Sequence, residues 1–365
     1  MRFAKEPPHD HRQRPTTGVL IVNLGTPDAP TAPALRRYLG QFLSDPRVVE
    51  IPAIVWKLIL HGIILRVRPA RSAAKYASIW TPEGSPLRVW TDKLGTLLQG
   101  YLGERGHRLI VKTAMRYGQP SVASQLDALK AEGARRILVV PLYPQYSGAT
   151  SASVMDEVFA WGRRRRHVPE LRFISRFADD TGYIGALADS VKAHWQHEGR
   201  GDKLVMSFHG MPERTLHLGD PYHCDCHLTA RLLAERLGLR KDDYVVSFQS
   251  RFGRAKWLQP YTEPTLRQLG QQGVRRVDVI CPAFVGDCIE TLEEIAMEGK
   301  DAFLASGGKE FSYIPCLNDR PQWLRAFTAL CEQHLQGWPT LAADQPPEVA
   351  LQATQERAKA LGARN

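Results

Sequence analysis

Five acidic residues in the last third of the chain are spaced so that one helix could carry them all on one side. In order they are Asp287, Glu290, Glu294, Glu298 and Asp301, separated by 3, 4, 4 and 3 positions. At 3.6 residues per α-helical turn they fall within about 80° of arc. Lys300 is the single base among them. A row of oxygen ligands without a local cation suits a path for a divalent metal ion, and the alternative is a solvated acidic face.

His209 is a second residue with chemical potential. It follows a strand-like run over 203–208 and precedes a Gly-Met-Pro turn, which would expose an imidazole at the rim of a sheet. A neutral imidazole accepts a proton near pH 7 or binds a borderline divalent metal. Across a cleft from Glu290, it would make a pair suited to metal handling with proton removal. The alternative is a structural histidine.

The elements that must position these residues alternate along the chain. The expected strands are 19–23, 108–114, 136–141, 172–176, 203–208, 244–248, 277–281 and 310–314. The expected helices include 34–43, 93–102, 120–132, 183–197, 228–237, 261–271 and 288–305. This alternation predicts α/β architecture with open parallel sheets flanked by helices. Right-handed crossovers would bring the carboxyl ends of the strands to a shared rim.

The strand and helix pattern repeats on either side of residues 177–181, which predicts two similar Rossmann-like domains. The expected segments are a disordered lead (1–16), a first domain (17–177), a second domain (178–318), a helix packing back on the first domain (319–340) and an exposed tail (341–365). Unusual motifs follow six of the strands. Because ligands bind outside the carboxyl ends of open α/β sheets, these motifs predict one interdomain cleft.

Composition narrows the class of protein. The chain has 365 residues, 43% of them hydrophobic and 24% charged, as in a globular protein. Its net charge is +10, partly from basic patches such as 163–166 and the Arg66, Arg68 and Arg71 group. Such patches attract anionic lipid, carboxylate ligands or nucleic acid. Because the sequence carries no nucleic-acid motif, we expect no nucleic-acid partner.

The cysteines and the N-terminus indicate a compartment. All six cysteines lie beyond residue 223 and have no disulfide-framework spacing, and the first 16 residues have no signal-peptide pattern. Both features favour a reducing cytoplasm. The most apolar run, 51–67, is interrupted by Pro52, Lys57 and His61 and is too short to span a bilayer. It is either a core helix or an exposed lip that touches a membrane or an apolar ligand.

The HCDCH segment at 223–227 has the composition of a metal site. It lacks a second ligand pair at a zinc-like spacing. The two interpretations are a metal site and a turn that leads into the helix beginning near Leu228.

Ten motifs taken together resemble the ferrochelatases, which insert ferrous iron into a porphyrin. In the first half they are NLGTP (23–27), GSPL (84–87), MRY (115–117) and YPQYS (143–147). In the second half they are SFHGMP (207–212), GDPY (219–222), FQSRFG (248–253), WL (257–258), CPAF (281–284) and DCIETLEEI (287–295). The likeness runs in order from about residue 17 to about residue 335. Each motif alone is weak, and the set is specific.

The resemblance implies a chelatase-like fold with a porphyrin cleft between the two domains. It implies catalytic roles for His209 and Glu290, with Glu294 and Glu298 passing the metal in or protons out. The implied metal residues are His209, Glu290, Glu294 and Glu298. The implied porphyrin-binding residues are Leu24, Arg116, Tyr117, Tyr146, Ser147 and Trp257. It also matches the run near 51–65 to an apolar lip flanking the pocket, which reverses the preference that periodicity alone gives to a core helix.

Two positions depart from patterns found in parts of that family. Cys288 stands where animal members carry His, and the two interpretations are a small buried residue and a second proton acceptor. Gly148, Ala149 and Thr150 follow the YPQYS motif, and no cysteine follows Cys331. The cysteines of the family's iron–sulfur cluster are therefore missing, and we expect no [2Fe–2S] cluster.

The sequence therefore predicts a bacterial-type ferrochelatase of the lyase class. The expected reaction inserts Fe²⁺ into protoporphyrin IX to give protohaem with release of two protons, the last step of haem biosynthesis. We expect ferrous iron as a substrate, no tightly bound cofactor, and a cytoplasmic protein with peripheral contact to anionic membrane. The alternatives are a chelatase for coproporphyrin or cobalt, and a non-catalytic tetrapyrrole or metal carrier.

Overall fold

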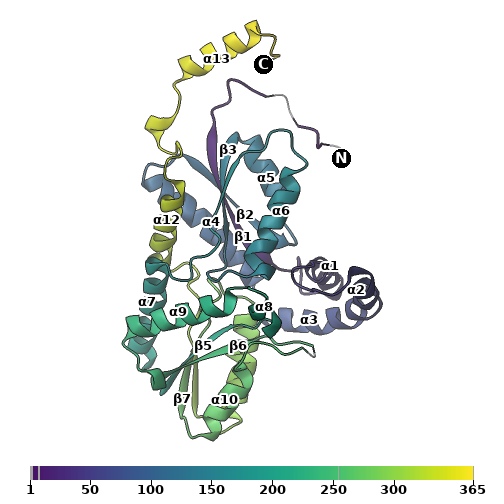
Figure 1. Ribbon diagram of the computed structural model, residues 1–365. Coiled ribbons are helices and arrows are strands. Elements are labelled where there is room, and N and C mark those ends of the chain that lie inside the picture. Colours follow the sequence, from purple (N-terminus) through teal and green to yellow (C-terminus); the bar gives the residue numbers. More distant parts are fainter. Residues whose placement is uncertain (1–2, 7–8, 254, 365) are drawn as a thin grey trace.

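The computed structural model describes residues 3–6, 9–253 and 255–364, and its core is two four-stranded sheets (Figure 1). All pairings are parallel, in the orders β2-β1-β3-β4 and β6-β5-β7-β8. The first sheet comprises β1 (Thr16–Gly25), β2 (Leu109–Tyr117), β3 (Ala134–Pro141) and β4 (Glu170–Phe173). The second comprises β5 (Lys203–His209), β6 (Tyr244–Gln249), β7 (Arg276–Ile280) and β8 (Glu310–Tyr313). The expected strands and the two-sheet α/β fold are confirmed.

Helices cover both sheets. In the first half they are α1 (Ala32–Phe42), α2 (Ala53–Ile59), η1 (Leu60–Ile64), α3 (Leu65–Ile79), α4 (Pro86–Glu104), α5 (Val122–Ala131), η2 (Gly148–Ala152) and α6 (Ser153–Gly162). The second half has α7 (Thr181–Glu198), α8 (Glu213–His217), α9 (Tyr222–Leu237), η3 (Lys241–Asp243), α10 (Thr262–Gln271), η4 (Glu290–Gly299) and α11 (Lys300–Leu304). The chain then forms α12 (Pro321–Leu335), η5 (Ala342–Asp344) and α13 (Glu348–Ala360).

The central strands are buried on both faces. Residues 19–22 of β1 are 0% exposed, and so are 137–140 of β3. Because a parallel sheet covered by helices has no solvent face, such strands are continuous apolar runs instead of alternating ones. These runs hold β1 and β3 at fixed positions, and the residues that follow them are therefore rigidly placed.

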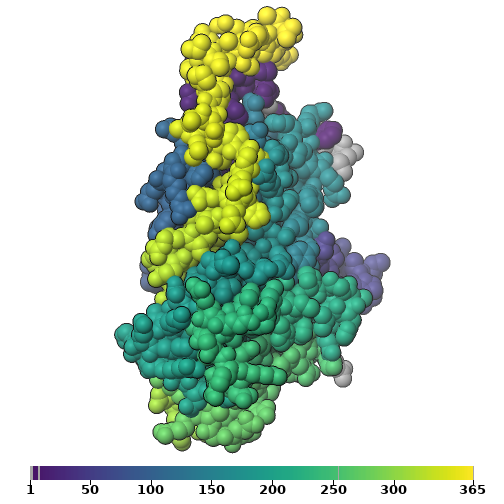
Figure 2. Space-filling model, turned by 60° about the vertical axis from the view of Figure 1, so that its left-hand side comes forward, coloured from purple at the N-terminus to yellow at the C-terminus, as the bar shows by residue number. Residues whose placement is uncertain are grey.

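Helix α12 connects the two halves. It lies against α4 and α7, and Trp323 on it is fully buried against Phe177 and Tyr183. Figure 2 shows the C-terminal segment, in yellow, lying along the surface of the first half. The division of the chain into domains stays a prediction, but this contact fixes the two sheets to each other.

One expected helix has a different geometry. Residues 288–305 do not form a single α-helix, because Glu290–Gly299 is a π-helix that continues into the short helix α11. At its end the Lys300 N–H donates to the Ile295 carbonyl, five residues back. Runs of π-helix are rare and frequently mark functional sites.

Candidate active site

A pocket opens between the two sheets, at the carboxyl ends of their strands. Residues near the end of β1 and residues at or after the ends of β3, β5, β6 and β7 line it, as the predicted cleft requires. The space between its walls is about 1040 Å³ when the open solvent at its mouth is included. Apolar and aromatic side chains form most of the wall, among them Leu24, Phe42, Leu87, Met211, Tyr222, Phe252, Trp257 and Phe284. The pocket suits a large apolar ligand.

His209 lies in the wall of this pocket, at the last position of β5. Its Nδ1 is 2.6 Å from the carbonyl oxygen of Gly210. Since a carbonyl only accepts hydrogen bonds, Nδ1 carries the proton and Nε2 keeps the lone pair. The Tyr222 hydroxyl donates to the main-chain oxygen of His209 at 2.9 Å. The imidazole is thus held in one tautomer with one nitrogen able to accept a proton or bind a metal.

Glu290 lies in the same wall, at the first position of the π-helix η4. The side-chain amide of Gln249 donates to the Glu290 main-chain oxygen at 2.6 Å. Gln249 is also the strand partner of His209 in the second sheet. One residue therefore connects the strand that ends at His209 with the helix that begins at Glu290.

Glu294, one helical step farther along, is half-buried and does not line the pocket. Its two carboxylate oxygens accept from the backbone N–H and the hydroxyl of Ser250, each at 2.5 Å. Burial raises the pKa of Glu294 and the nearby charge of Glu290 adds to this, while the Ser250 hydrogen bonds and His209 oppose it. A carboxyl with a raised pKa holds a proton at a higher pH than an ordinary glutamate does.

Glu298 continues the row to the surface, where 56% of its side chain is exposed. Lys75 of α3 pairs with it at 2.8 Å and with the neighbouring Glu293 at 2.9 Å. The three glutamates therefore run from the pocket wall to solvent, as the spacing predicts. The expectation that the row has no local cation was wrong, because Lys75 comes from a distant part of the chain.

The row is shorter than the sequence predicts. Asp287 precedes the helix and is 5% exposed, with hydrogen bonds to its carboxylate from Asn318 at 2.7 Å and from Tyr313 and Thr291. Asp301 lies on α11 and is exposed. The single α-helical stripe of five acids was wrong at both ends, because Asp287 anchors the helix start and the π geometry ends before Asp301.

Cys288, between Asp287 and Glu290 in sequence, is 1% exposed. Burial raises the pKa of its thiol well above the ordinary value, and the charge of Glu290 adds to this. The thiol therefore stays protonated near pH 7. It does not replace a histidine as a second proton acceptor at this position.

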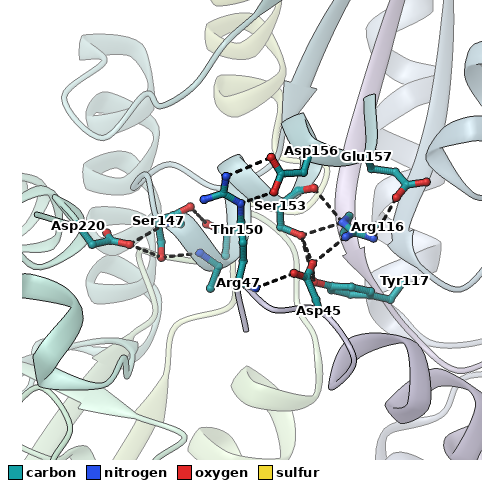
Figure 3. A network of polar contacts seen from close by, with 12 residues as sticks. Asp45, Arg47, Arg116, Tyr117, Ser147, Thr150, Ser153, Asp156, Glu157 and Asp220 are labelled. Carbon is teal, nitrogen blue, oxygen red and sulfur yellow. Dashed lines mark hydrogen bonds and ion pairs between the residues drawn. The ribbon is translucent and has the colours of Figure 1, made fainter. Parts of the chain in front are cut away.

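Arg116 and Tyr117 belong to a buried polar network beside the pocket (Figure 3). One carboxylate oxygen of Asp45 accepts from Arg116 at 2.7 Å, from Tyr117 at 2.8 Å and from Ser153 at 2.6 Å. Burial alone would raise the pKa of Asp45, but these hydrogen bonds and the Arg116 charge outweigh it and lower the pKa. Arg116 and Tyr117 do not line the pocket, and Tyr117 reaches its wall through ring contact with Phe42 at 5.2 Å.

The other four expected porphyrin residues fall into two places. Leu24 and Trp257 line the pocket. Gly25 allows the turn after Leu24, because its φ is +115° and an added Cβ would lie 1.8 Å from the Tyr117 carbonyl oxygen. Tyr146 lines an adjoining cavity with Arg47 and Asp220, while Ser147 is fully buried and donates to Asp220 at 3.1 Å (Figure 3).

Several residues around the site carried no individual expectation. Gln249, Ser250 and Tyr222 lie within the FQSRFG and GDPY motifs but gave no sign of what they contact. Lys75 lies in no motif. Their roles depend on tertiary contacts with η4 or β5, which sequence spacing does not reveal.

The apolar run near 51–65 forms α2 and η1, which project beside the junction of the two halves (Figure 1). Its most exposed apolar residues are Ile54 at 81% and Leu58 at 73%. Leu60 is fully buried, and the Trp56 indole donates to the Leu43 carbonyl at 2.6 Å. The run is therefore both an exposed lip and a packed inner face. None of its residues lines the pocket.

Comparison with known proteins connects this geometry to a family. A sequence profile described as Ferrochelatase matches residues 16–335. A ferrochelatase of Methylibium petroleiphilum is 65% identical over 363 residues, covering 100% of this chain and 99% of that protein. One from a Polaromonas species is 64% identical over 368 residues, covering 100% of both chains. The solved structure of SirB from Bacillus subtilis with Fe³⁺ has a TM-score of 0.50 at 13% identity, covers 87% of this chain and 95% of SirB, and supports the fold alone.

Proposed function

The chain belongs to the ferrochelatase family and inserts ferrous iron into a porphyrin for haem synthesis, and we propose that the porphyrin is protoporphyrin IX, held in the pocket between the sheets. One observation carries this proposal: His209 and Glu290 share a largely apolar pocket at the carboxyl ends of both sheets. The product would be protohaem, the end of that synthesis, and we assign the reaction to the lyase class.

The reaction exchanges two protons for one metal ion. A free-base porphyrin holds two N–H protons inward, and four metal–nitrogen bonds replace them. We propose that the rigid walls bind and distort the flat ring, using the binding energy of its apolar faces. Leu24, Phe42 and Trp257 are suited to contact those faces.

We assign proton acceptance to His209, whose Nε2 keeps a lone pair while Nδ1–H donates to Gly210. Glu290 assists as the second group in the pocket wall that can take a proton or hold the incoming iron. Glu294, with its raised pKa, would relay protons, and Glu298 at the surface would receive iron from solvent. In this proposal protons leave and iron enters along the π-helix.

The ligand's carboxylates also need partners. The Arg68 guanidinium lies over the ring of Phe252 at 5.6 Å, and Phe252 lines the pocket. We propose that Arg68 receives a propionate at the mouth of the pocket. Arg116 and Tyr117 would support the ring indirectly, through Phe42, instead of touching it.

We further propose a cytoplasmic protein that touches anionic membrane through Ile54 and Leu58. In the described part of the chain no helix has the length and apolarity needed to cross a bilayer. We also propose that the protein holds no tightly bound cofactor, so purified samples should lack acid-labile sulfide and the absorption bands of an iron–sulfur cluster.

Anaerobic incubation with Fe²⁺ and porphyrin, followed by the haem spectrum, tests the assignment. The native chain should form haem faster from protoporphyrin than from coproporphyrin. His209→Ala should abolish insertion and change the free energy of unfolding by less than about 2 kcal/mol, because the half-buried imidazole at the end of β5 faces the pocket and packs little. His197→Ala, at an exposed position of α7, is the matched control. If His209→Ala turned over like the native chain, His209 would not be the proton acceptor. If the native chain formed haem faster from coproporphyrin, coproporphyrin and not protoporphyrin would be the substrate.

A further inference from the structure

Helix α9 begins with two histidines one helical turn apart. His223 and His227 occupy positions i and i+4, so their side chains share one face of the helix. Their ring centroids are 4.5 Å apart, with 56° between the ring planes. Paired histidines at this spacing on a helix are a recurring way to hold a divalent metal ion.

Both rings pack on a single aromatic residue. His223 stacks on Phe248 with centroids 5.9 Å apart and 18° between planes, and His227 lies 6.1 Å from the same ring. Phe248 is 1% exposed, in the edge strand β6. The two imidazoles are therefore held on the same side of α9 before any ligand arrives, which lowers the entropy cost of bringing them together.

The two imidazoles are also in a suitable protonation state. Partial burial lowers the pKa of His223, and partial burial against its ring neighbours together with repulsion from His223 lowers the pKa of His227, although much of the His227 side chain stays exposed. Both rings are therefore neutral near pH 7, the form that binds metal. Within residues 3–6, 9–253 and 255–364, no hydrogen bond engages their ring nitrogens, while His223 is half-buried and His227 exposed.

The other residues of the HCDCH segment have different positions. Asp225 is buried and accepts from Arg176 at 2.6 Å and from the Tyr146 N–H at 3.2 Å. Cys226 is fully buried. Cys224 is exposed, but the described residues contain no group of three or more His, Cys, Asp or Glu side chains arranged around one ion.

We propose that His223 and His227 form a two-imidazole site for a borderline divalent metal ion of the class that includes Zn²⁺, Ni²⁺ and Fe²⁺, with water completing the coordination. Imidazole nitrogen suits these ions. Two protein ligands give an open, exchangeable site and not a structural one. Neither histidine lines the pocket, but Tyr222, directly before His223, does, and it hydrogen-bonds His209. The metal bound at His223 would therefore lie next in sequence to Tyr222, a residue of the pocket wall.

Ni²⁺ titration by calorimetry tests this site in the full-length chain. A His209→Ala background removes the pocket imidazole, and the change in Ni²⁺ binding on each further substitution then shows what that α9 histidine contributes. Adding His227→Gln or His223→Gln should weaken Ni²⁺ binding by at least about tenfold, the lower end of the loss that even outer-shell changes cause at metal sites. Adding His197→Gln, which removes one exposed imidazole from α7, should leave binding unchanged. Melting temperatures check that each variant is folded.

Two results would overturn the proposal. One is Ni²⁺ affinity that survives both His223→Gln and His227→Gln in folded protein. The other is affinity lost in Cys224→Ser but retained in His227→Gln, because the exposed thiol would then be the ligand. A fall in Ni²⁺ affinity as the pH drops through the imidazole range supports the site, since protons compete for the same nitrogens.

Discussion

Glu298 of the π-helix pairs with Lys75 of α3, with 2.8 Å between Oε1 and Nζ. The glutamate farthest from the pocket thus has its own cation, which competes with any arriving metal ion. Glu290, at the other end of the helix, lies in the pocket wall. Glu290 therefore faces the pocket and Glu298 faces a lysine at the surface. This difference predicts that the two carboxylates affect different kinetic constants.

We expect Glu290→Gln to lower kcat by about 10²-fold or more, the usual effect of losing a group that moves protons. Glu298→Gln should leave kcat unchanged and raise the apparent KM for Fe²⁺ by up to about fivefold, equivalent to about 1 kcal/mol. Lys75→Met frees Glu298 and should lower that KM. Steady-state assays at varied Fe²⁺ measure all three. Equal losses of kcat in Glu290→Gln and Glu298→Gln would contradict a graded path.

The lip predicts weak, salt-sensitive membrane binding. Ile54→Ser with Leu58→Ser should reduce binding to anionic vesicles and leave the melting temperature nearly unchanged, because both side chains are more than two-thirds exposed. Trp56→Ser with Ile59→Ser is the matched control and should instead lower the melting temperature, since both residues are half-buried. Vesicle sedimentation at several salt concentrations measures the binding. Unchanged sedimentation of the folded Ile54 and Leu58 double variant would argue against a membrane lip.

The fold was largely predictable from sequence because each parallel strand is an apolar run between helices. Because ligands bind at the carboxyl ends of the strands in open α/β sheets, the sequence then predicted that His209 and Glu290 lie near one cleft. The spacing of acids 287–301 could not reveal π geometry, because residue spacing does not distinguish i→i+4 from i→i+5 hydrogen bonding, and it does not show tertiary contacts such as the Gln249 amide on the Glu290 carbonyl. Those contacts come from β6, about 40 residues away.

The sequence also did not reveal which charged side chains pair with each other. Lys75 and Glu298 are 223 positions apart, and no motif connects them. Arg116 belongs to a motif, but its side chain turns to Asp45 and Ser153 and not into the pocket, which the packing of the α1–α2 connection and of α6 decides. The motif thus predicted that Arg116 lies near the site, but it did not predict which residues the Arg116 side chain contacts.

The Asp45 network predicts a large effect on stability. Asp45→Asn removes the carboxylate charge that faces half-buried Arg116, which keeps its hydrogen bonds to the Ser153 carbonyl at 3.0 Å and hydroxyl at 2.7 Å and the weaker Glu157 contact at 3.6 Å. We expect the free energy of unfolding to fall by about 2–4 kcal/mol, somewhat less than when a buried charge loses every partner.

The native pKa of Asp45 is lowered, so the contribution of Asp45 to the stability of the folded state is full above the ordinary pKa of 3.8 and is lost as pH falls through the native value. Urea unfolding from pH 2 to pH 7 should show a difference between the two proteins that shrinks only below about pH 3.8. A constant difference at every pH would contradict the ionic origin.

The raised pKa of Glu294 predicts that the stability of the folded chain depends on pH in the opposite direction. Its pKa is raised above the ordinary 4.5, so the folded state holds the proton more tightly than the unfolded state. Native stability should therefore decrease as pH rises from about 4.5 through the raised value, while Glu294→Gln, which has no such proton, lacks that decrease. Thermal unfolding of the metal-free chain across pH 4–8 measures the difference.

Ser250→Gly provides the matched control for Glu294. Ser250 has a φ of +64°, a conformation that glycine adopts freely, so the change removes the hydroxyl donor with little backbone strain. Without that hydrogen bond the charged carboxylate is less favourable, and the loss of stability between pH 4.5 and 8 should become larger than in the native chain. If Ser250→Gly reduced the loss, or if the native chain and Glu294→Gln showed the same pH profile, the raised pKa and the proton-relay role built on it would both be wrong.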